Sequence, residues 1–499
     1  MEIKNYNEYI NKNKDFYFEI KDKFPVVKDG VYIHQMPDLN YIHGKNTKEK
    51  TRFVFETRTM TTINSDGLIL LELCDGRKTT NEIIDNICEI YNCIPKNAAQ
   101  FIIDFLYTST RLFNYIKFIE DKLDKAICIE KTGSKYHVIP QHYALELTSR
   151  CNLKCKHCYR SCTSNIEEKE ISYEVVMKLL KEMYSVGARY IEITGGEAFL
   201  HPNIKEILTY VCENYNFVAI LTNGTLLTSE MIDYLDMYKD KIIWSISLDS
   251  YREDFHDEFR GLRGAYKKTV SAIKQLAKRG HTVRVAMSIT DGNLYDIEKT
   301  INLVRNKLNG TFFGYSYVMP YGRGKDIEAV ISEEEKSRRV AEIDKYTDRE
   351  ELRGYINKID KEKVKSMKDD MINCGAGWRT VAIGPDGTVR PCIIMEENIV
   401  NIGNVNEDSI VNIMNQELVN KLHSLPWPVD GECTSCPNEL FCKWCSYRAF
   451  TINKERINQG LGLCRWANKN NLNEVIDFNS IDEDKFNMCL TACSMCECE

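Results

Sequence analysis

The sequence lacks several features that would place it outside the soluble globular proteins. No run of about 18 apolar residues occurs, so we expect no membrane-spanning segment. The polar N-terminus, MEIKNYNEYINKNKDF, has no apolar core of the kind that a signal peptide needs. The net charge of −7 gives no general electrostatic reason to bind nucleic acid or an anionic membrane. We therefore expect a cytoplasmic protein without a nucleic-acid or membrane partner.

The composition is ordinary except for cysteine. Hydrophobic residues make up 43% and charged residues 28% of 499 residues, which excludes general disorder. At roughly 150 residues per domain, the length predicts about three domains. The chain has 20 cysteines. Because no export signal accompanies them, we expect reduced thiols that bind metal or do chemistry.

The first 115 residues predict a small α+β module. Strand-like stretches, VYIHQM and RFVFETRTMTTIN, precede helical patterns. Apolar residues at helical spacing predict two helix faces, formed by Ile83, Ile84, Ile87, Cys88 and Tyr91 and by Phe101, Ile102, Phe105 and Leu106. We assign residues 1–115 to this module and residues 116–141 to a linker.

From residue 142 the pattern changes to alternating strands and helices. Six strand-like runs occur: YALELT, RYIEIT, FVAILT, IIWSIS, VRVAMSI and TFFGYSYV. Such alternation indicates parallel β/α units, and six units predict an α/β fold with a partial (β/α)6 barrel over residues 142–331. A charged helical bridge (332–372), a cysteine-rich domain (373–470) and a cysteine-rich tail (471–499) follow.

Three cysteines directly follow the first strand of this region. In LTSRCNLKCKHCY, Cys151, Cys155 and Cys158 have C-x3-C-x2-C spacing. Cysteine thiolates are the usual ligands of iron–sulfur clusters, and three of them leave one iron of a four-iron cluster open for another ligand. A zinc knuckle is the alternative, but it uses paired C-x2-C motifs.

This motif and its position resemble the radical S-adenosylmethionine (SAM) superfamily. The resemblance implies that a [4Fe–4S] cluster binds SAM at its open iron and cleaves it to methionine and a 5′-deoxyadenosyl radical. His157, next to the third cysteine, would lie by the adenine. In ITGGEAFL, Gly195 and Gly196 would approach the amino group of SAM, with Glu197 nearby.

Two more segments carry the resemblance further along the chain. LTNGTLL places Asn223 after the third strand, and SISLDS with DFHDEFRG supplies Ser247 and Arg260. In similar enzymes a serine and an arginine at these places contact the carboxylate or ribose of SAM, and an arginine fork suits a carboxylate. Asp249 is equally compatible with a contact to SAM and with a structural cap at the strand end. All these motifs lie at the C-terminal ends of strands, where β/α barrels have their active sites.

The second cysteine cluster resembles the SPASM domain, which holds auxiliary [4Fe–4S] clusters. It shows C-x12-G-x4-C followed by C-x2-C-x5-C-x2-C. The resemblance implies two auxiliary clusters and thus three clusters in all. The outer one would be held by Cys433, Cys436, Cys442 and Cys464, and the inner one by Cys374, Cys392 and Cys445. The usual last gap is three residues and not two, which puts the role of Cys445 in doubt. Paired C-x2-C motifs also leave two zinc sites as an alternative.

Two differences from the sequences of similar SPASM enzymes limit the range of reactions that we expect. No eighth cysteine precedes Cys374 closely, so the inner cluster is expected to have an open iron. Enzymes that convert a sulfatase cysteine to formylglycine carry an aspartate after the second cysteine of this domain, where this chain has Ile393. This difference argues against a sulfatase-maturing enzyme.

The segment TTINSDGLILLELCDGRKTTNEIIDNICEIYNC resembles the small recognition domain of ribosomal-peptide biosynthesis, similar to the pyrroloquinoline-quinone chaperone. Such a domain binds the leader of a precursor peptide as an added strand. FVFET (53–57) is the candidate edge. A winged-helix nucleic-acid module is the alternative, although the acidic balance of the chain argues mildly against it.

Cysteines outside the two clusters have other expected roles. The tail ends with Cys489, Cys493, Cys496 and Cys498. It is compatible with a disordered thiol tail, a redox or iron–sulfur delivery role, or donation of a ligand to a core cluster. A further six cysteines are interpreted as small apolar residues: Cys74, Cys88, Cys93, Cys128, Cys162 and Cys212.

Together these features predict a radical SAM maturase that installs a thioether crosslink in a ribosomally made peptide. The expected partners are a precursor with a leader and a cysteine-containing core, and a one-electron donor such as flavodoxin or ferredoxin. Carbon–carbon crosslinking is an alternative within this class. A noncatalytic peptide-binding or electron-transfer iron–sulfur protein is the alternative from another class.

Overall fold

The computed structural model divides the chain into two compact units, Met1–His137 and Val138–Glu499. The candidate edge FVFET and the tail cysteines lie outside the residues that the structure describes. Those residues are 6–37, 39–44, 61–162, 169–319, 321–356, 373–395, 399–426 and 445–476, with 428, 433, 436, 438 and 442.

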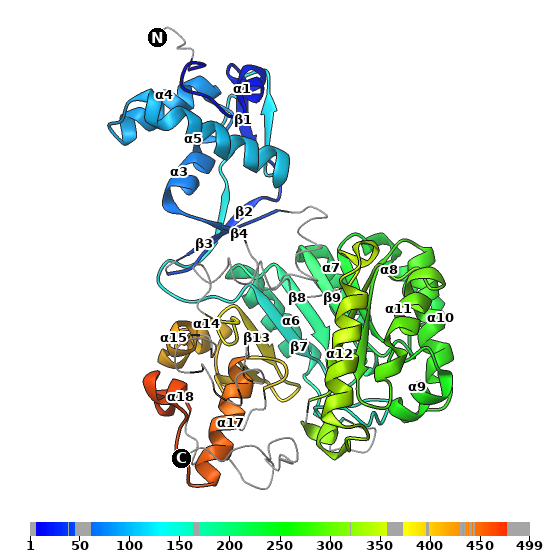
Figure 1. Ribbon diagram of the computed structural model, residues 1–499. Helices are drawn as coiled ribbons and strands as arrows, with labels where there is room; N and C mark the ends of the chain where they lie inside the picture. The colour runs from blue at the N-terminus through cyan, green and yellow to red at the C-terminus, as the bar shows by residue number, and fades with distance from the viewer. Residues whose placement is uncertain are drawn as a thin grey trace. The chain divides into compact units, whose positions relative to one another are not determined.

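The N-terminal unit combines two small sheets with a group of helices (Figure 1). One sheet pairs β1 (Phe24–Val27) with β5 (Ile116–Ile119) in antiparallel register. The other has the order β4-β3-β2-β6, with β2 and β6 parallel. Its strands are β2 (Tyr32–Gln35), β3 (Asn40–His43), β4 (Thr61–Ile63) and β6 (Glu130–Gly133). Because β5 and β6 belong to these sheets, the unit includes most of the stretch predicted as a linker.

The helices of this unit follow the predicted pattern only in part. They are α1 (Lys14–Ile20), α3 (Ser65–Leu73), α4 (Thr80–Ile90) and α5 (Pro95–Tyr107), with the π-turn η1 (Thr108–Leu112). A capping box between Thr79 and Glu82 starts α4, whose residues Ile83, Ile84 and Ile87 are buried.

Two aromatic residues of the predicted helix faces are exposed. Phe101 is 51% exposed and Tyr91 45% exposed. Positions 98, 99, 102, 103 and 106 form the buried face of α5. Phe101 lies just outside that stripe, because a helix turns by about 100° per residue.

The C-terminal unit is built on one nine-stranded sheet with the order β12-β11-β10-β9-β8-β7-β13-β14-β15. The six predicted strands are neighbours and parallel. They are β7 (His142–Glu146), β8 (Tyr190–Thr194), β9 (Phe217–Thr222), β10 (Ile242–Ser247), β11 (Thr282–Ile289) and β12 (Phe312–Tyr317). Helices follow these strands, so the β/α alternation is confirmed.

Three strands of the cysteine-rich region extend the same sheet. β13 (Thr380–Ile383) lies parallel to β7, and β14 (Thr388–Arg390) and β15 (Gly403–Asn404) continue in antiparallel register. The sheet is therefore mixed, which the sequence pattern did not predict. The first barrel strand, β7, is thus hydrogen-bonded to a strand of the cysteine-rich region.

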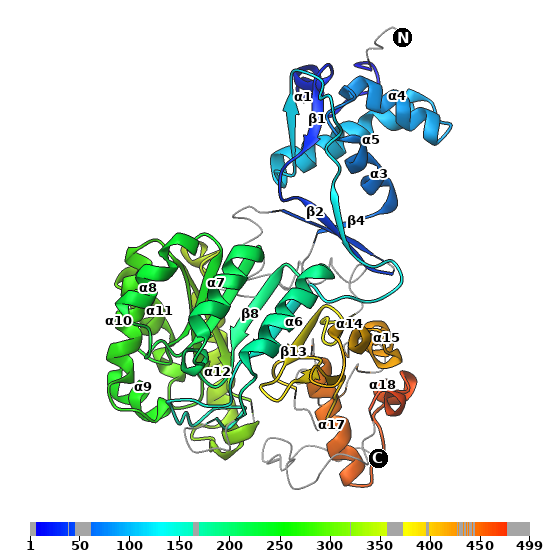
Figure 2. The same cartoon turned by 180° about the vertical axis from the view of Figure 1, so that it is seen from behind.

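Helices cover the sheet of this unit (Figures 1 and 2). In the barrel region they are α6 (Tyr173–Ser185), α7 (Ile204–Asn214), α8 (Ser229–Leu235), α9 (Glu253–Arg260), α10 (Ala265–Lys278), α11 (Ile297–Asn306) and α12 (Glu333–Thr347). In the cysteine-rich region they are α14 (Ile410–Met414), α15 (Glu417–Ser424), α17 (Ser446–Asn458) and α18 (Arg465–Lys469). Short 3-10 turns occur at Ala198–Leu200, Asp236–Tyr238, Leu294–Asp296, Gly322–Asp326, Glu350–Leu352 and Leu472–Glu474.

Strand β11 shows how the sheet makes room for a site. Buried residues alternate with partly exposed ones along its whole length. Val283 and Val285 point to one face, whereas Arg284 and Ser288 line a pocket on the other. A parallel sheet that is buried on both faces reads as continuously apolar, so this alternation reflects one polar, hollowed face.

Within the part of the chain that the structure describes, no helix is both long and apolar enough to cross a bilayer.

Candidate functional site

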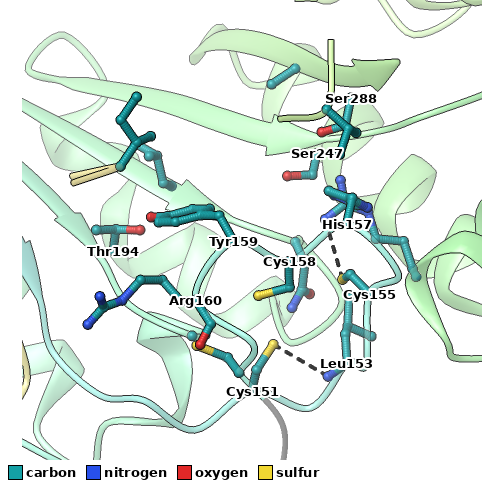
Figure 3. A pocket seen from close by; sticks show the side chains of 18 of the residues that line it. Cys151, Leu153, Cys155, His157, Cys158, Tyr159, Arg160, Thr194, Ser247 and Ser288 are labelled. Carbon is teal, nitrogen blue, oxygen red and sulfur yellow. Dashed lines mark hydrogen bonds between the residues drawn. The ribbon is translucent and has the colours of Figure 1, made fainter. Parts of the chain in front are cut away.

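A pocket of about 420 Å³ opens at the C-terminal ends of the barrel strands (Figure 3). The loop after β7 supplies Cys151, Cys155 and Cys158 to its wall. Gly195 follows β8, and Ser247 ends β10. The structure therefore brings the three thiols together with residues from separate strands, because parallel strands end at one edge of the sheet.

Each of the three thiols meets a hydrogen-bond donor. Leu153 N–H faces Cys151 Sγ at 3.4 Å, and Arg260 Nη1 faces Cys155 Sγ at 3.7 Å. Cys158 has a side-chain hydrogen bond with Cys162. Donors aimed at sulfur favour the thiolate that an iron cluster requires. The three residues therefore suit a cluster as ligands.

The thiols differ in their electrostatic surroundings. Burial raises the pKa of Cys151 to about 12. The hydrogen bond from Cys162 lowers the pKa of Cys158 to about 6. Cys162 was predicted to be only a small apolar residue, yet it is buried in the pocket wall beside Cys158. Its C-x3-C spacing from Cys158 was the available signal.

The two glycines of the GGE motif lie against the cluster loop. Gly196 N–H donates to Thr148 O at 2.7 Å, and Glu197 N–H donates to Arg150 O at 2.8 Å. A β-carbon on Gly196 would lie 2.2 Å from Arg150 O. Gly195 has a φ of +144°, which favours glycine. The motif thus keeps the backbones of β8 and the cluster loop in close contact.

Glu197 is buried and bonded to neighbouring protein groups. Its carboxylate accepts from Thr222 Oγ1 at 2.8 Å and from Asn223 N–H at 2.9 Å. Burial raises its pKa, while these donors act in the opposite direction. Asn223 Nδ2 donates to Asn152 Oδ1 at 3.0 Å. Glu197 and Asn223 therefore fasten the ends of β8 and β9 to the cluster loop.

Arg260 is held by Asp249 in a buried, two-bond ion pair. Its Nε and Nη2 donate to the two carboxylate oxygens at 2.5 and 2.9 Å. Burial opposes the charge on Asp249, but Arg260 more than compensates, and the pKa of Asp249 falls to about 2. Two guanidinium nitrogens are thus engaged, and Nη1 faces Cys155. Asp249 also accepts from Ser288 N–H at 3.0 Å, which fits a structural anchor.

His157 stacks on Phe259, with the ring centroids 4.3 Å apart. Burial lowers its pKa to about 3, so the imidazole is neutral at physiological pH. A neutral, stacked ring is suited to an aromatic neighbour such as adenine.

Comparison with known proteins agrees with this geometry. The family model of the radical SAM superfamily matches residues 145–305, and that of SPASM, an iron–sulfur cluster-binding domain, matches residues 374–437. The antilisterial bacteriocin subtilosin biosynthesis protein AlbA of Bacillus subtilis (strain 168) is 33% identical over 468 residues, covering 92% of this chain and 99% of that protein. The chain belongs to the radical SAM superfamily. It is therefore an enzyme of this superfamily.

Two further similarities concern a relative and a solved structure. An AdoMet-dependent heme synthase of Methanosarcina barkeri (strain Fusaro / DSM 804) is 27% identical over 338 residues, covering 64% of this chain and 95% of that protein. Streptococcus suis SuiB bound to its precursor peptide SuiA has a TM-score of 0.59 at 13% identity, covering 84% of this chain and 94% of that chain. At this low identity the likeness to SuiB shows the fold alone.

The SPASM cysteines of this radical SAM enzyme form two groups. Cys392 is partly buried and lies near Cys374 and Cys445, and desolvation raises its pKa to about 12. The second group surrounds Cys442, whose pKa burial also raises to about 12, and contains Cys433, Cys436 and Cys464. The resemblance to the SPASM domain implied these two sets for an outer and an inner cluster, and Cys445 also acts electrostatically on Cys442. Among the residues that the structure describes, no group of three or more His, Cys, Asp or Glu side chains is arranged to hold a single metal ion.

Proposed function

We propose that this radical SAM enzyme matures a ribosomally synthesised precursor peptide by installing a cysteine-derived thioether. The observation that carries the proposal is the similarity to AlbA along nearly the full length of both chains. AlbA is named as a bacteriocin biosynthesis protein, and SuiB is described as bound to a precursor peptide. The pocket, whose wall contains the thiols of Cys151, Cys155 and Cys158, supports the chemistry that this class of maturation needs.

In this proposal Cys151, Cys155 and Cys158 hold a [4Fe–4S] cluster that binds SAM. Cleavage of the bound SAM would supply a 5′-deoxyadenosyl radical, which would abstract a hydrogen atom from the peptide. Gly195 and Gly196 would approach the amino group of SAM, as the resemblance implies.

The remaining predicted contacts have separate tasks. Ser247 lines the pocket at the end of β10, and His157 offers a neutral ring. Arg260 faces Cys155, so we propose that it contacts the cluster ligand Cys155 as well as SAM. Glu197 and Asn223 bond to each other and so hold together the ends of β8 and β9 at the pocket.

The SPASM cysteines are proposed to hold two auxiliary clusters, giving three clusters in the enzyme. Cys433, Cys436, Cys442 and Cys464 would fully ligate the outer one. Cys374, Cys392 and Cys445 give the inner one three thiolates, so a substrate cysteine could complete it, since an exposed iron favours soft sulfur ligands. The inner cluster would then position the sulfur for bond formation.

The net reaction removes two hydrogens for each crosslink. A carbon–hydrogen bond and a sulfur–hydrogen bond break, and a carbon–sulfur bond forms. One hydrogen atom would go to the 5′-deoxyadenosyl radical, the thiol proton would be released, and one electron would leave to an acceptor, a role that we assign to the auxiliary clusters. A one-electron donor such as flavodoxin or ferredoxin would start each turnover.

We assign recognition of the precursor leader to the N-terminal unit. Its small sheets and helices are a separate compact unit, and its charged or thiol side chains show no metal-binding group among the described residues. A sheet edge can bind an extended peptide through backbone hydrogen bonds.

Mass spectrometry of a co-expressed precursor tests the proposal. A short, cysteine-containing reading frame encoded next to this gene would supply the probe. We expect a loss of two hydrogens per crosslink and thiols that no longer react with iodoacetamide. The matched control is the enzyme with Cys151, Cys155 and Cys158 all replaced by alanine, which should leave the peptide unchanged.

Other outcomes separate the alternatives. A loss of two hydrogens with fully reactive thiols would indicate a carbon–carbon crosslink. No modification together with tight peptide binding would favour a noncatalytic iron–sulfur protein. Either result would contradict the thioether assignment.

A further inference from the structure

One residue beyond the last barrel strand bonds three carbonyls of the cluster loop. Arg323 N–H donates to Cys158 O at 3.0 Å. Its Nε donates to Cys155 O at 2.7 Å, and its Nη2 donates to Cys162 O at 2.9 Å. Arg323 thus reaches across 168 residues of sequence to the loop that carries the three thiols.

The preceding glycine allows this close approach. Gly322 has a φ of +52°, and a β-carbon there would lie 2.4 Å from both Cys158 O and Tyr159 O. No other residue could fit without moving the loop. The pair Gly322–Arg323 therefore fits the backbone of the loop specifically.

The opposite side of the loop is bonded by a different element. Lys154 N–H donates to Arg260 O at 3.2 Å, and Lys156 N–H donates to Phe259 O at 2.9 Å, both at the C-terminal end of α9. The N–H groups of the loop thus bond α9, while its carbonyls bond Arg323. Over residues 147–162, which the structure describes, the loop has no named helix or strand, so these bonds and those from Gly196 and Glu197 hold its shape.

We infer that Arg323 is a positioning residue for the SAM cluster, whose guanidinium sets the spacing between Cys155 and Cys162 and so holds Cys158 between them. The inference rests on the proposed function, because it takes Cys151, Cys155 and Cys158 as the cluster ligands. Groups that orient metal ligands are part of a metal site, and their loss typically weakens metal binding.

The guanidinium, and not its charge alone, provides this function. Nε and Nη2 bond two carbonyls that belong to residues seven positions apart, Cys155 and Cys162. A lysine ammonium is a single point and lacks this fixed fork. Arg323→Lys is therefore expected to behave like Arg323→Met, although it keeps the positive charge.

The test follows the cluster itself in the full-length, reconstituted enzyme. The readouts are the rate of iron loss to a chelator, and the SAM concentration that half-completes the SAM-induced change in the EPR signal of the reduced cluster. The matched control is Arg189→Met. Arg189 Nη1 also bonds two carbonyls, Tyr184 O at 2.8 Å and Ala188 O at 3.0 Å, at the other end of the barrel strands.

In Arg323→Lys and Arg323→Met we expect iron of the SAM-responsive cluster to be lost to the chelator roughly 10- to 100-fold faster. We expect the SAM concentration that half-completes the EPR change to rise by a similar factor, roughly 10- to 100-fold. Gly322→Ala should show the same defect. Arg189→Met should lower thermal stability to a similar extent but keep both cluster properties at the wild-type level.

Three results would overturn the inference. They are wild-type cluster properties in both Arg323 variants, full rescue by Arg323→Lys, and an equal defect in Arg189→Met. Failure of the cluster assignment in the proposed function would look different, because the wild-type enzyme would then lack any SAM-responsive EPR signal.

Discussion

Glu146 and Arg390 form a buried ion pair between positions 244 residues apart in the sequence. Arg390 Nη2 donates to Glu146 Oε2 at 2.5 Å, and the side chains are 1% and 3% exposed. Arg390 Nη1 also donates to Met395 O at 2.7 Å, and Arg160 Nη2 lies 3.5 Å from the same carboxylate oxygen. The Glu146 carboxylate thus joins the first barrel strand to β14 and the cluster loop, and Arg390 continues the contact to the segment after Cys392.

Replacing Glu146 by glutamine should destabilise the C-terminal unit strongly. The substitution leaves the Arg390 guanidinium buried without its counter-charge, which costs about 3–5 kcal/mol. Anaerobic thermal unfolding of the cluster-loaded enzyme measures the effect. The double variant Glu146→Met/Arg390→Met removes both charges and should recover much of the loss. A double variant that is less stable than Glu146→Gln would contradict this account.

Glu192 should make the stability fall as the pH rises through neutrality. Burial raises its pKa from 4.5 to about 7. Between these values the unfolded chain has released the proton and the folded chain retains it, so stability decreases with pH by at most about 1.4 kcal/mol per unit. Relative to Glu192→Gln, the wild type should lose about 2 kcal/mol between about pH 5.5 and 7.5.

Anaerobic denaturant unfolding of both proteins across this pH range measures the difference. A constant difference between the two proteins would show that Glu192 titrates near its ordinary value in the folded state.

Replacing Gly196 by alanine should disturb the cluster loop. The added β-carbon would lie 2.2 Å from Arg150 O, so the backbone must move. We expect SAM binding, followed by the EPR change, to weaken by roughly 10- to 100-fold. Gly280→Ala is the control, because Gly280 has a φ of +81° but nothing within 4 Å of the new carbon. Similar SAM binding in both variants would contradict a role for close backbone contact at Gly196.

The sequence predicted those parts of the site that follow from local order. The spacing of Cys151, Cys155 and Cys158 after a strand was enough to place them at the pocket. The alternation of strands and helices was enough to order β7 to β12. Both arguments use only neighbouring residues and the rule that parallel strands end at one edge.

Contacts between distant segments could not be predicted in this way. β13 is a four-residue strand whose pairing with β7 depends on tertiary packing. Arg323 looked like any loop arginine, and its three carbonyl partners appear only when the chain is folded. The Asp249–Arg260 pair likewise needed the structure, because a carboxylate at a strand end suits either a ligand or an anchor.

Deleting residues 1–137 should separate peptide recognition from SAM chemistry. This segment is a compact unit of its own, whereas the pocket residues belong to the other unit. The shortened enzyme should still cleave SAM without peptide but bind the precursor weakly, as measured by fluorescence anisotropy of a labelled precursor. A precursor lacking its leader serves as the control and should bind both enzymes equally weakly. Equal affinity of both enzymes for the complete precursor would contradict the assignment of leader recognition.

The central claim is that a radical generated at this pocket takes hydrogen from a peptide. The most direct measurement uses a precursor deuterated throughout its core, with SAM and dithionite under anaerobic conditions, and mass spectrometry of the 5′-deoxyadenosine formed. The account predicts 5′-deoxyadenosine with one deuterium, in step with a crosslinked peptide. Unlabelled 5′-deoxyadenosine beside a modified peptide would contradict it.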